Sequence, residues 1–396
     1  MNYTNQGSNQ AINDQGLIFD IKSLYAFLER VPDTRKPRGR LYVLPLLLLL
    51  MLLAKLGGED TPSGMADWVA HRIDELYEMN ILPKKKAPSH MTYRRTLQTT
   101  IQPDEFEGLV SEYHQSCLQE GQEVVFSLDG KTLKGTILFG ETRGTHLLSI
   151  FVPGQGLVLV EAEVDRKENE IVVAPKILQQ VNLTGALVIG DAMHAQRQVS
   201  KQVVEAGGEY MWTIKGNQWR TQWAIEKLFV REVCNLKKGA PLSQACQMTT
   251  EVGKGHGRIE KRTILVSNEL NEYLDWPYVG QVFRIEREIW YEKYRGRTRE
   301  VVYGLTSLTP KKASPKKLLK LNRQYWGIEN GLHYRRDVTL HEDATRLTKG
   351  KAGHNMAILN NLTVGICLKH GLTNLAKARR LFSAKPKQAL ALLTSA

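Results

Sequence analysis

The sequence is poor in the features that mark secreted and disulfide-rich proteins. Its 396 residues include only four cysteines, which form neither a C-x-x-C pair nor the dense spacing of a disulfide scaffold: Cys117, Cys234, Cys246 and Cys367. The first twenty residues are polar and lack the basic start and apolar core of a secretory signal. We therefore expect a protein of a reducing cytoplasm, with a flexible leader over residues 1–17.

A continuous apolar run long enough to span a membrane is also absent. The longest run extends from Leu41 to Ala54 and has 14 residues, whereas a transmembrane helix needs about 20. The run is short and is interrupted by Pro45. It therefore predicts a helix that is buried on all sides within a helical N-terminal domain.

Acidic residues are outnumbered by basic ones. Lys and Arg total 54 and Asp and Glu total 41, which leaves a formal net charge of +13. Such a surplus favours phosphate-rich partners or anionic membrane surfaces. The basic residues cluster in four stretches: 30–40, 83–86, 295–299 and 310–320. One such cluster is usually a solvated face, but four of them favour nucleic acid, because each neutralised phosphate releases counterions.

One stretch looks like a nucleotide-binding loop but lacks its essential glycine. The segment VFSLDGKTLKG (125–135) contains the Gly-Lys-Thr that closes a P-loop, yet the position five residues before Gly130 is Val125. The apolar residues before Gly130 predict a strand. The segment therefore predicts a strand that ends on the carboxylate of Asp129, and not a phosphate cradle.

Residues 18–118 predict helices without an intervening strand. The segments 66–79 and 89–98, joined by a Pro- and Lys-rich turn, are compatible with a helical DNA-binding unit. Its second helix would be capped by Ser89 and would display three basic side chains, His90, Arg94 and Arg95. An ordinary helical pair with a basic surface would give the same pattern.

The apolar pattern changes over residues 119–220. Three strands in sequence are followed by an alternation of helices and strands, which predicts a mixed α/β (α+β) sheet. The order resembles the ribonuclease-H-like core, although the pattern alone leaves several α/β folds open. Three further segments follow: a mainly β insertion over 221–308, the last helical part of the same domain over 309–370, and a basic C-terminal tail over 371–396.

Two predicted strands end in the same way. One stops on Asp129 and the other on Asp191, each after a run of apolar residues. If these strands are neighbours, as in the ribonuclease-H-like order, the two carboxylates converge and could hold a hard divalent cation, which prefers oxygen ligands. Each acid could instead cap a turn, and Asp191 could be the N-cap of the helix that follows.

A third acid is predicted on a helix beyond the β insertion. Glu329 stands in YWGIENGLHYRRD, and a helix would place His333 and Arg336 on its face at i+4 and i+7. A solvated ion-pair face would look similar. Three nearby acids are rivals for the role: Asp337, Glu342 and Asp343.

These residues lie in five linked blocks: SLDGKTLKGT, EVDRKENEI, VIGDAMHAQ, WTIKGNQ and QYWGIENGLHYRRDVTLHEDATR. Together the blocks resemble the DDE transposases of bacterial insertion sequences, specifically the H-repeat-associated group, in order and spacing over nearly the whole chain. The resemblance implies a ribonuclease-H-like catalytic domain with an inserted β region, preceded by a helical transposase-associated domain. It also implies that Asp129, Asp191 and Glu329 hold two Mg²⁺ ions, for which Mn²⁺ would substitute, and cut DNA without a covalent protein intermediate.

DNA contacts are expected around these acids. Lys131 and Lys134 follow the first acid. Lys215, Asn217 and Gln218 follow the strand that ends at Ile214. Each of them could equally be a plain surface residue.

The last helix departs from a wider signature of related transposases, which has an arginine four residues before the acid and a lysine seven after it. These positions hold Tyr325 and Arg336 here. We expect Arg336 to contact a phosphate and Arg323 to stand in for the missing arginine. His333 and Trp326 could contact a distorted terminal base, although a tryptophan followed by Ile328 could also be core.

The function implied is a DNA transposase that binds terminal inverted repeats, cuts them with Mg²⁺ and joins the 3′ ends to target DNA. A homodimer or larger assembly would bring two ends together, in the bacterial cytoplasm and on the nucleoid when DNA is bound. Two alternatives remain open. One is a catalytically silent or domesticated DNA-binding relic, and the other is a metal-dependent nuclease that does not transpose.

Overall fold

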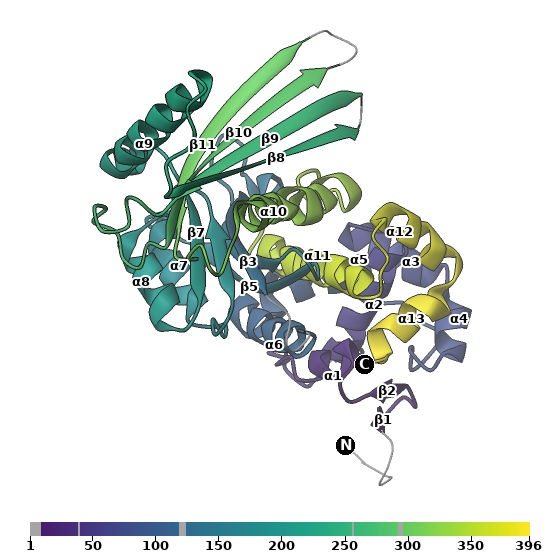
Figure 1. Ribbon diagram of the computed structural model, residues 1–396. Coiled ribbons are helices and arrows are strands. Elements are labelled where there is room, and N and C mark those ends of the chain that lie inside the picture. The colour runs from purple at the N-terminus through teal and green to yellow at the C-terminus, as the bar shows by residue number, and fades with distance from the viewer. Residues whose placement is uncertain (1–8, 39, 119–123, 256, 292–295) are drawn as a thin grey trace.

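The computed structural model describes residues 9–38, 40–118, 124–255, 257–291 and 296–396. Helices at both ends of the chain pack together beside a nine-stranded sheet (Figure 1). The α-helices are α1 (Leu24–Leu28), α2 (Leu44–Leu56), α3 (Pro62–Ala70), α4 (Ile73–Glu78), α5 (His90–Arg95), α6 (Pro103–Ser116), α7 (Glu170–Leu178), α8 (Arg197–Glu205), α9 (Trp219–Lys237), α10 (Pro315–Tyr325), α11 (Ala352–Lys369), α12 (Leu375–Ala384) and α13 (Pro386–Thr394).

The strands are β1 (Gln10–Ile12), β2 (Ile18–Asp20), β3 (Val125–Thr132), β4 (His146–Val152), β5 (Leu157–Val164), β6 (Leu187–Gly190), β7 (Glu209–Ile214), β8 (Cys246–Gly255), β9 (Arg258–Ser267), β10 (Gln281–Tyr291) and β11 (Arg297–Thr306). Two short segments are 3-10 helical, η2 (Lys134–Thr136) and η3 (Gly216–Gln218). Three are π-helical, η1 (Thr96–Thr100), η4 (Glu329–His333) and η5 (Arg335–Thr339).

The leucine-rich segment forms helix α2 at the centre of the helical region. All of its residues except Pro45 are buried, which confirms the prediction of a helix buried on all sides. Pro45 lies in the first turn, where its missing N–H would have had no partner within the helix. Even Lys55 is buried, with its Nζ 3.2 Å from Asp60 Oδ1. In the described ranges, no helix is both long and apolar enough to cross a membrane.

The main sheet has the strand order β5-β4-β3-β6-β7-β11-β10-β9-β8. Strands β5, β4 and β3 form an antiparallel meander, and β3, β6 and β7 run parallel. This is the ribonuclease-H-like order, so the predicted fold class is confirmed. The β insertion extends the same sheet, because β11 pairs with the end of β7 from Tyr303↔Ile214 to Thr306↔Met211.

Helices cover both faces of the sheet. On one face, α7, α8 and α9 bury apolar side chains against residues such as Leu128, Val188 and Trp212. On the other face, α10 buries Leu318 and Leu319 against the alternate residues of the same strands. The period of two along each strand therefore decides which side chains meet α10.

The described parts of both ends of the chain are more ordered than the sequence indicates. The leader expected over residues 1–17 contains strand β1, which pairs with β2; residues 1–8 lie outside the described ranges, as do residues 119–123 at the expected domain boundary. The expected C-terminal tail forms α12 and α13, whose apolar residues share one core with α1, α2, α6 and α11. The N-terminal helices and the C-terminal helices are therefore one packed unit.

Candidate active site

Asp129 and Asp191 lie where the parallel pairing of β3 with β6 ends, a position that we term the acid edge. The prediction that the first strand ends on Asp129 is wrong, because β3 continues to Thr132 and pairs there with β4, whereas β6 does end directly before Asp191. The register of β3 and β6 pairs Leu128 with Gly190, the residues immediately before the two acids. Both acids continue the face on which Val125 and Ile189 pack against α10, because side chains alternate along a strand. The two strands are therefore neighbours, as the predicted convergence of Asp129 and Asp191 requires.

Glu329 approaches this edge from the helical segment that follows α10. It is exposed and begins the π-helical segment η4. Burial raises the pKa of the Tyr325 phenol, and the negative charges of Asp129, Asp191, Glu329 and Glu170 raise it further. The three acids of the predicted triad and Glu170 therefore all lie within electrostatic range of the Tyr325 phenol.

The described acids are not positioned as a complete set of metal ligands. Among the residues that the structure describes, no three His, Cys, Asp or Glu side chains are grouped closely enough to hold a metal ion. Burial, together with the charges of Glu170 and Asp191, raises the pKa of Asp129 to about 7 even though His194 opposes the change. Uncompensated negative charge of this kind, on oxygen ligands, suits a hard divalent cation.

Glu170 is the functional candidate that sequence reasoning missed. It opens α7 directly after the N-cap Asn169. Its Oε1 lies 2.7 Å from His146 Nε2, and its Oε2 lies 3.1 Å from His194 Nε2. Although burial raises the pKa of Glu170, these two contacts hold it at about 2. Glu170 therefore carries a negative charge beside Asp129 at neutral pH.

Gly130 provides the room for this arrangement. A Cβ atom at Gly130 would lie 2.2 Å from Glu170 Oε1 and 2.8 Å from His146 Nε2. Glu170 stands in the block EVDRKENEI, so its position among the five blocks was a signal. That block alone did not indicate which of its acids turns toward Asp129.

The expectation that Lys131 contacts DNA is wrong. Its side chain is only 7% exposed, and its Nζ lies 2.6 Å from Asp337 Oδ1 and 3.5 Å from Asp343 Oδ1. It also lies 3.6 Å from Glu342 Oε2. The rivals of Glu329 for the third acid are therefore grouped around Lys131, where they compensate a buried cation.

The expectation that Arg336 contacts a phosphate is also wrong. Its side chain is fully buried, and Nε donates to both oxygens of Glu342 at 2.9 Å. Its Nη1 donates to Glu161 Oε2 at 2.7 Å and to Asn361 Oδ1 at 3.1 Å. Arg336 therefore ties the segment after Glu329 to strand β5 and helix α11.

His333 faces the acids and not the open surface. Its Nδ1 lies 3.6 Å from Asp129 Oδ2. Burial and the nearby charges of Arg336 and Lys131 lower its pKa to about 3, so the ring is neutral at neutral pH. Trp326, by contrast, is 42% exposed and does not belong to the core.

The segment after β7 lies against the loop that follows Asp191. Asn217 Nδ2 donates to the carbonyl of Ala192 at 2.5 Å, and Gln218 Nε2 donates to that of Ala195 at 3.1 Å. Lys215 and Asn217 are exposed. These two residues therefore lie on the surface next to the acid edge.

The remaining basic candidates are accessible, but some are already paired. Lys134 Nζ lies 3.2 Å from Asp343, and Arg323 lies 3.2 Å from Glu251. Arg94 and Arg95 are exposed on α5. Ser89 occupies the N-cap position of α5, but its side chain makes no capping hydrogen bond.

In the basic stretch at 295–299, the two described arginines are compensated within the β insertion. Residue 295 lies outside the described residues. Arg297 pairs with Glu288 and Arg299 with Glu286, both on the neighbouring strand β10. The two described arginines of this stretch therefore contribute little free positive charge for a nucleic acid.

Two family models match the chain. The model described as DDE_Tnp_1-associated matches residues 25–114, and the model described as Transposase DDE domain matches residues 120–364. Similar curated proteins include "Putative transposase YncI" of Escherichia coli O157:H7, 27% identical over 356 residues that cover 87% of each chain. Another is "H repeat-associated putative transposase YhhI" of Escherichia coli K12, 25% identical over 355 residues, 88% of this chain and 90% of that protein.

One solved structure also aligns with the chain. It is the piggyBac transposase synaptic complex with hairpin DNA, which aligns over 94% of this chain and 76% of that chain with a TM-score of 0.40 and 11% identity. The fold assignment rests on the strand order described above and not on this alignment.

Proposed function

The chain belongs to the family with a transposase DDE domain, and from this premise we propose that it binds the ends of an insertion sequence, cuts them and joins them to target DNA. Asp129, Asp191 and Glu329 are the proposed catalytic acids. The observation that carries the proposal is the register of β3 and β6, which brings Asp129 and Asp191 next to each other.

The oxygen ligands of these acids are suited to Mg²⁺ ions. Asp129, Asp191 and Glu329 would hold the metal, which supplies activation of water or a 3′-hydroxyl and stabilisation of the leaving oxygen. The raised pKa of Asp129 supports this assignment, because a cation relieves the repulsion among the carboxylates. Members of this family generally use divalent metal ions.

Two further residues would support the reaction from beside the acids. Tyr325 keeps its phenolic proton at neutral pH, so it can donate a hydrogen bond to a carboxylate or to a phosphate oxygen. Glu170, whose carboxylate is held by His146 and His194, would keep a fixed negative charge beside the Asp129 carboxylate and limit the positions that this carboxylate can take. Neither role requires Glu170 to bind a metal.

The test uses a duplex that carries the terminal sequence flanking the coding region, together with a target plasmid and Mg²⁺. Wild type should cut the duplex and join its 3′ end to the plasmid. Asp129→Asn and Glu329→Gln should each lower cutting by roughly 10²- to 10³-fold or more. The matched control is Asp67→Asn, an exposed acid on α3, which should cut like wild type.

Each alternative function has its own outcome in this assay. Cutting without joining would identify a nuclease. Binding of the duplex without cutting by wild type would identify a silent relic. Equal cutting by wild type and Asp129→Asn would reject the proposed acids.

A further inference from the structure

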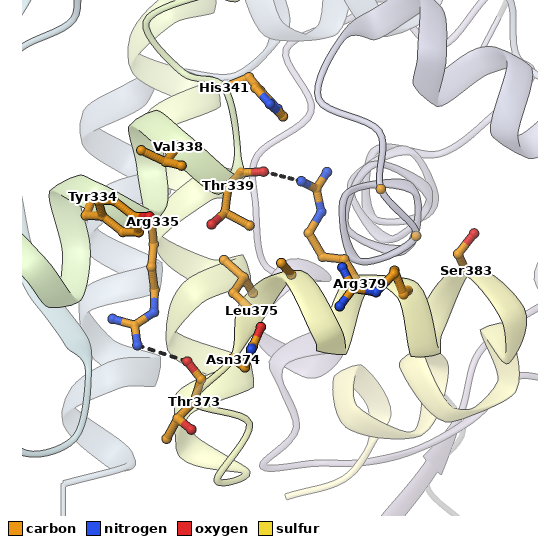
Figure 2. Close-up of a pocket in the computed structure, with 14 residues that line it drawn as sticks. Tyr334, Arg335, Val338, Thr339, His341, Thr373, Asn374, Leu375, Arg379 and Ser383 are labelled. Carbon is orange, nitrogen blue, oxygen red and sulfur yellow. Dashed lines mark hydrogen bonds between the residues drawn. The ribbon is translucent and has the colours of Figure 1, made fainter. Parts of the chain in front are cut away.

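A cavity of about 770 Å³ lies where three distant parts of the chain meet. Its walls come from Gly57 and Gly58 just after α2, from the segment around η5 that follows Glu329, and from α12 with the two residues before it. Figure 2 shows Tyr334 and Arg335 on one side of the cavity and Arg379 on another. It is separate from the acid edge, although the same helical segment contributes to both.

The lining of this cavity is positively charged. Arg335, Arg379 and Arg380 contribute three guanidinium groups, His341 adds an imidazole, and no carboxylate is among the residues that line the cavity in the described part of the chain. One acid, Asp60, lies behind this lining, with its Oδ2 2.9 Å from Arg379 Nη2 and 3.3 Å from His341 Nδ1. A single carboxylate leaves an excess of positive charge at the cavity.

The three arginines have different roles. Arg379 is buried and donates from Nε to the carbonyl of Lys55 at 3.0 Å, so it forms part of the wall. Arg335 donates from Nη2 to the carbonyl of Thr373 at 3.0 Å, an interaction drawn in Figure 2. Arg380 is exposed, and within the described ranges it forms no hydrogen bond or ion pair. Arg380 is therefore the cation that is ready for an external anion.

The cavity is open and its rim is partly apolar. Tyr334 is 57% exposed and Val338 is 52% exposed, on the segment that continues from Glu329. An open concave surface with cations and an exposed aromatic ring suits a chain of linked phosphates and sugars better than an enclosed small ligand. Tyr334 directly follows His333, whose Nδ1 lies 3.6 Å from Asp129 Oδ2, so the segment that lines the cavity begins beside the acids.

We propose that this cavity binds the sugar-phosphate backbone of DNA whose other part lies at the acid edge, with Arg380 at a phosphate and Tyr334 and Val338 against the sugars. This inference rests on the proposed function, because it assumes that the chain acts on DNA. It adds a binding site to which α12 contributes, in a region where the sequence indicated only a basic tail.

The test measures DNA binding by fluorescence anisotropy over a series of salt concentrations, in EDTA so that no cutting occurs. Arg380→Ala should reduce the salt dependence of log K by about 0.9, the contribution of one phosphate contact, which corresponds to about an eightfold lower affinity at 0.1 M salt relative to 1 M. The loss should be equal for end-containing and scrambled duplexes, because phosphate contacts carry no sequence information.

Two further variants define the site. Lys387→Ala removes the same charge from an exposed position on α13 that does not line the cavity, and it should keep the wild-type salt slope. Tyr334→Ser should lower affinity at an unchanged slope, because it removes ring contact and no charge.

The inference is overturned if Arg380→Ala keeps the affinity and slope of wild type, or if Lys387→Ala loses as much. Displacement of the DNA by inorganic phosphate at constant ionic strength would indicate a site for free anions and would also overturn it. Since the assay includes neither metal nor cutting, its failure is distinct from failure of the proposed catalysis, which the cutting and joining assay detects.

Discussion

Replacement of Arg336 by methionine tests whether its charge belongs to the interior. Arg336 is fully buried and pairs with Glu161 and Glu342, which are themselves 2% and 7% exposed. Removal of one partner from a buried ion pair typically costs about 3–5 kcal/mol, because the other charge remains buried. The protein should therefore lose a large part of its stability, and not primarily its affinity for DNA.

The structure places the expected loss near the lower end of this range. Glu161 keeps hydrogen bonds from Ser149 Oγ at 2.7 Å and Asn361 Nδ2 at 3.0 Å. Glu342 keeps one from Asn360 Nδ2 at 2.7 Å. We therefore expect a decrease of about 3 kcal/mol in the free energy of unfolding, measured by urea titration at pH 7 with tryptophan fluorescence.

Two variants serve as comparisons. Arg346→Met changes an exposed arginine that forms no hydrogen bond or ion pair in the described residues, and should change stability by less than about 0.5 kcal/mol. Glu161→Gln combined with Arg336→Met should be more stable than the sum of the single changes predicts, because both charges are removed together. A loss below about 1 kcal/mol for Arg336→Met, accompanied by a weaker salt dependence of DNA binding, would refute the reasoning.

Three further predictions concern pH, the acid edge and the β insertion. Burial lowers the pKa of His114 from 6.5 to about 4. The stability that the neutral His114 ring contributes is therefore fully present above pH 6.5 and is lost as the pH falls through 4. The variant His114→Gln should reduce the loss of unfolding free energy between pH 7 and pH 4.5 by roughly 2–3 kcal/mol. Gly130→Ala should displace Glu170 and lower DNA cutting at least about tenfold at unchanged DNA affinity, whereas Gly108→Ala, where a Cβ meets nothing within 4 Å, should cut like wild type. Arg299→Ala should leave the DNA affinity and its salt dependence unchanged in a titration, because this arginine is paired with a glutamate of the adjacent strand.

The sequence was sufficient for features that depend on one element or on neighbouring strands. A run of leucines with no polar face predicts a buried helix, and α2 is one. Two apolar runs that each precede an acid predict two strands, and β3 and β6 are these strands, although β3 continues past Asp129 to Thr132. These features follow from period and hydrophobicity alone.

The predicted role of Arg336 was wrong for two reasons, one in the local helix geometry and one in a contact with a residue far away in the sequence. Its assignment to the face of Glu329 assumed 3.6 residues per turn, but η4 and η5 are π-helical. A π-helix has more residues per turn, so positions seven apart no longer share a face. Its partner Glu161 lies on β5, far away in the sequence, and no local pattern indicates that contact.

The sequence by itself determined the apolar strands that lead to Asp129 and Asp191, the buried α2 and the excess of basic residues. Only the tertiary structure decided which charges are compensated inside and which remain at the surface. Lys131 and Arg336 meet carboxylates from other elements, whereas Arg380 opens onto a cavity built from three distant segments. The reason is that charge and periodicity are properties of a segment, whereas burial and pairing depend on which segments the fold brings together.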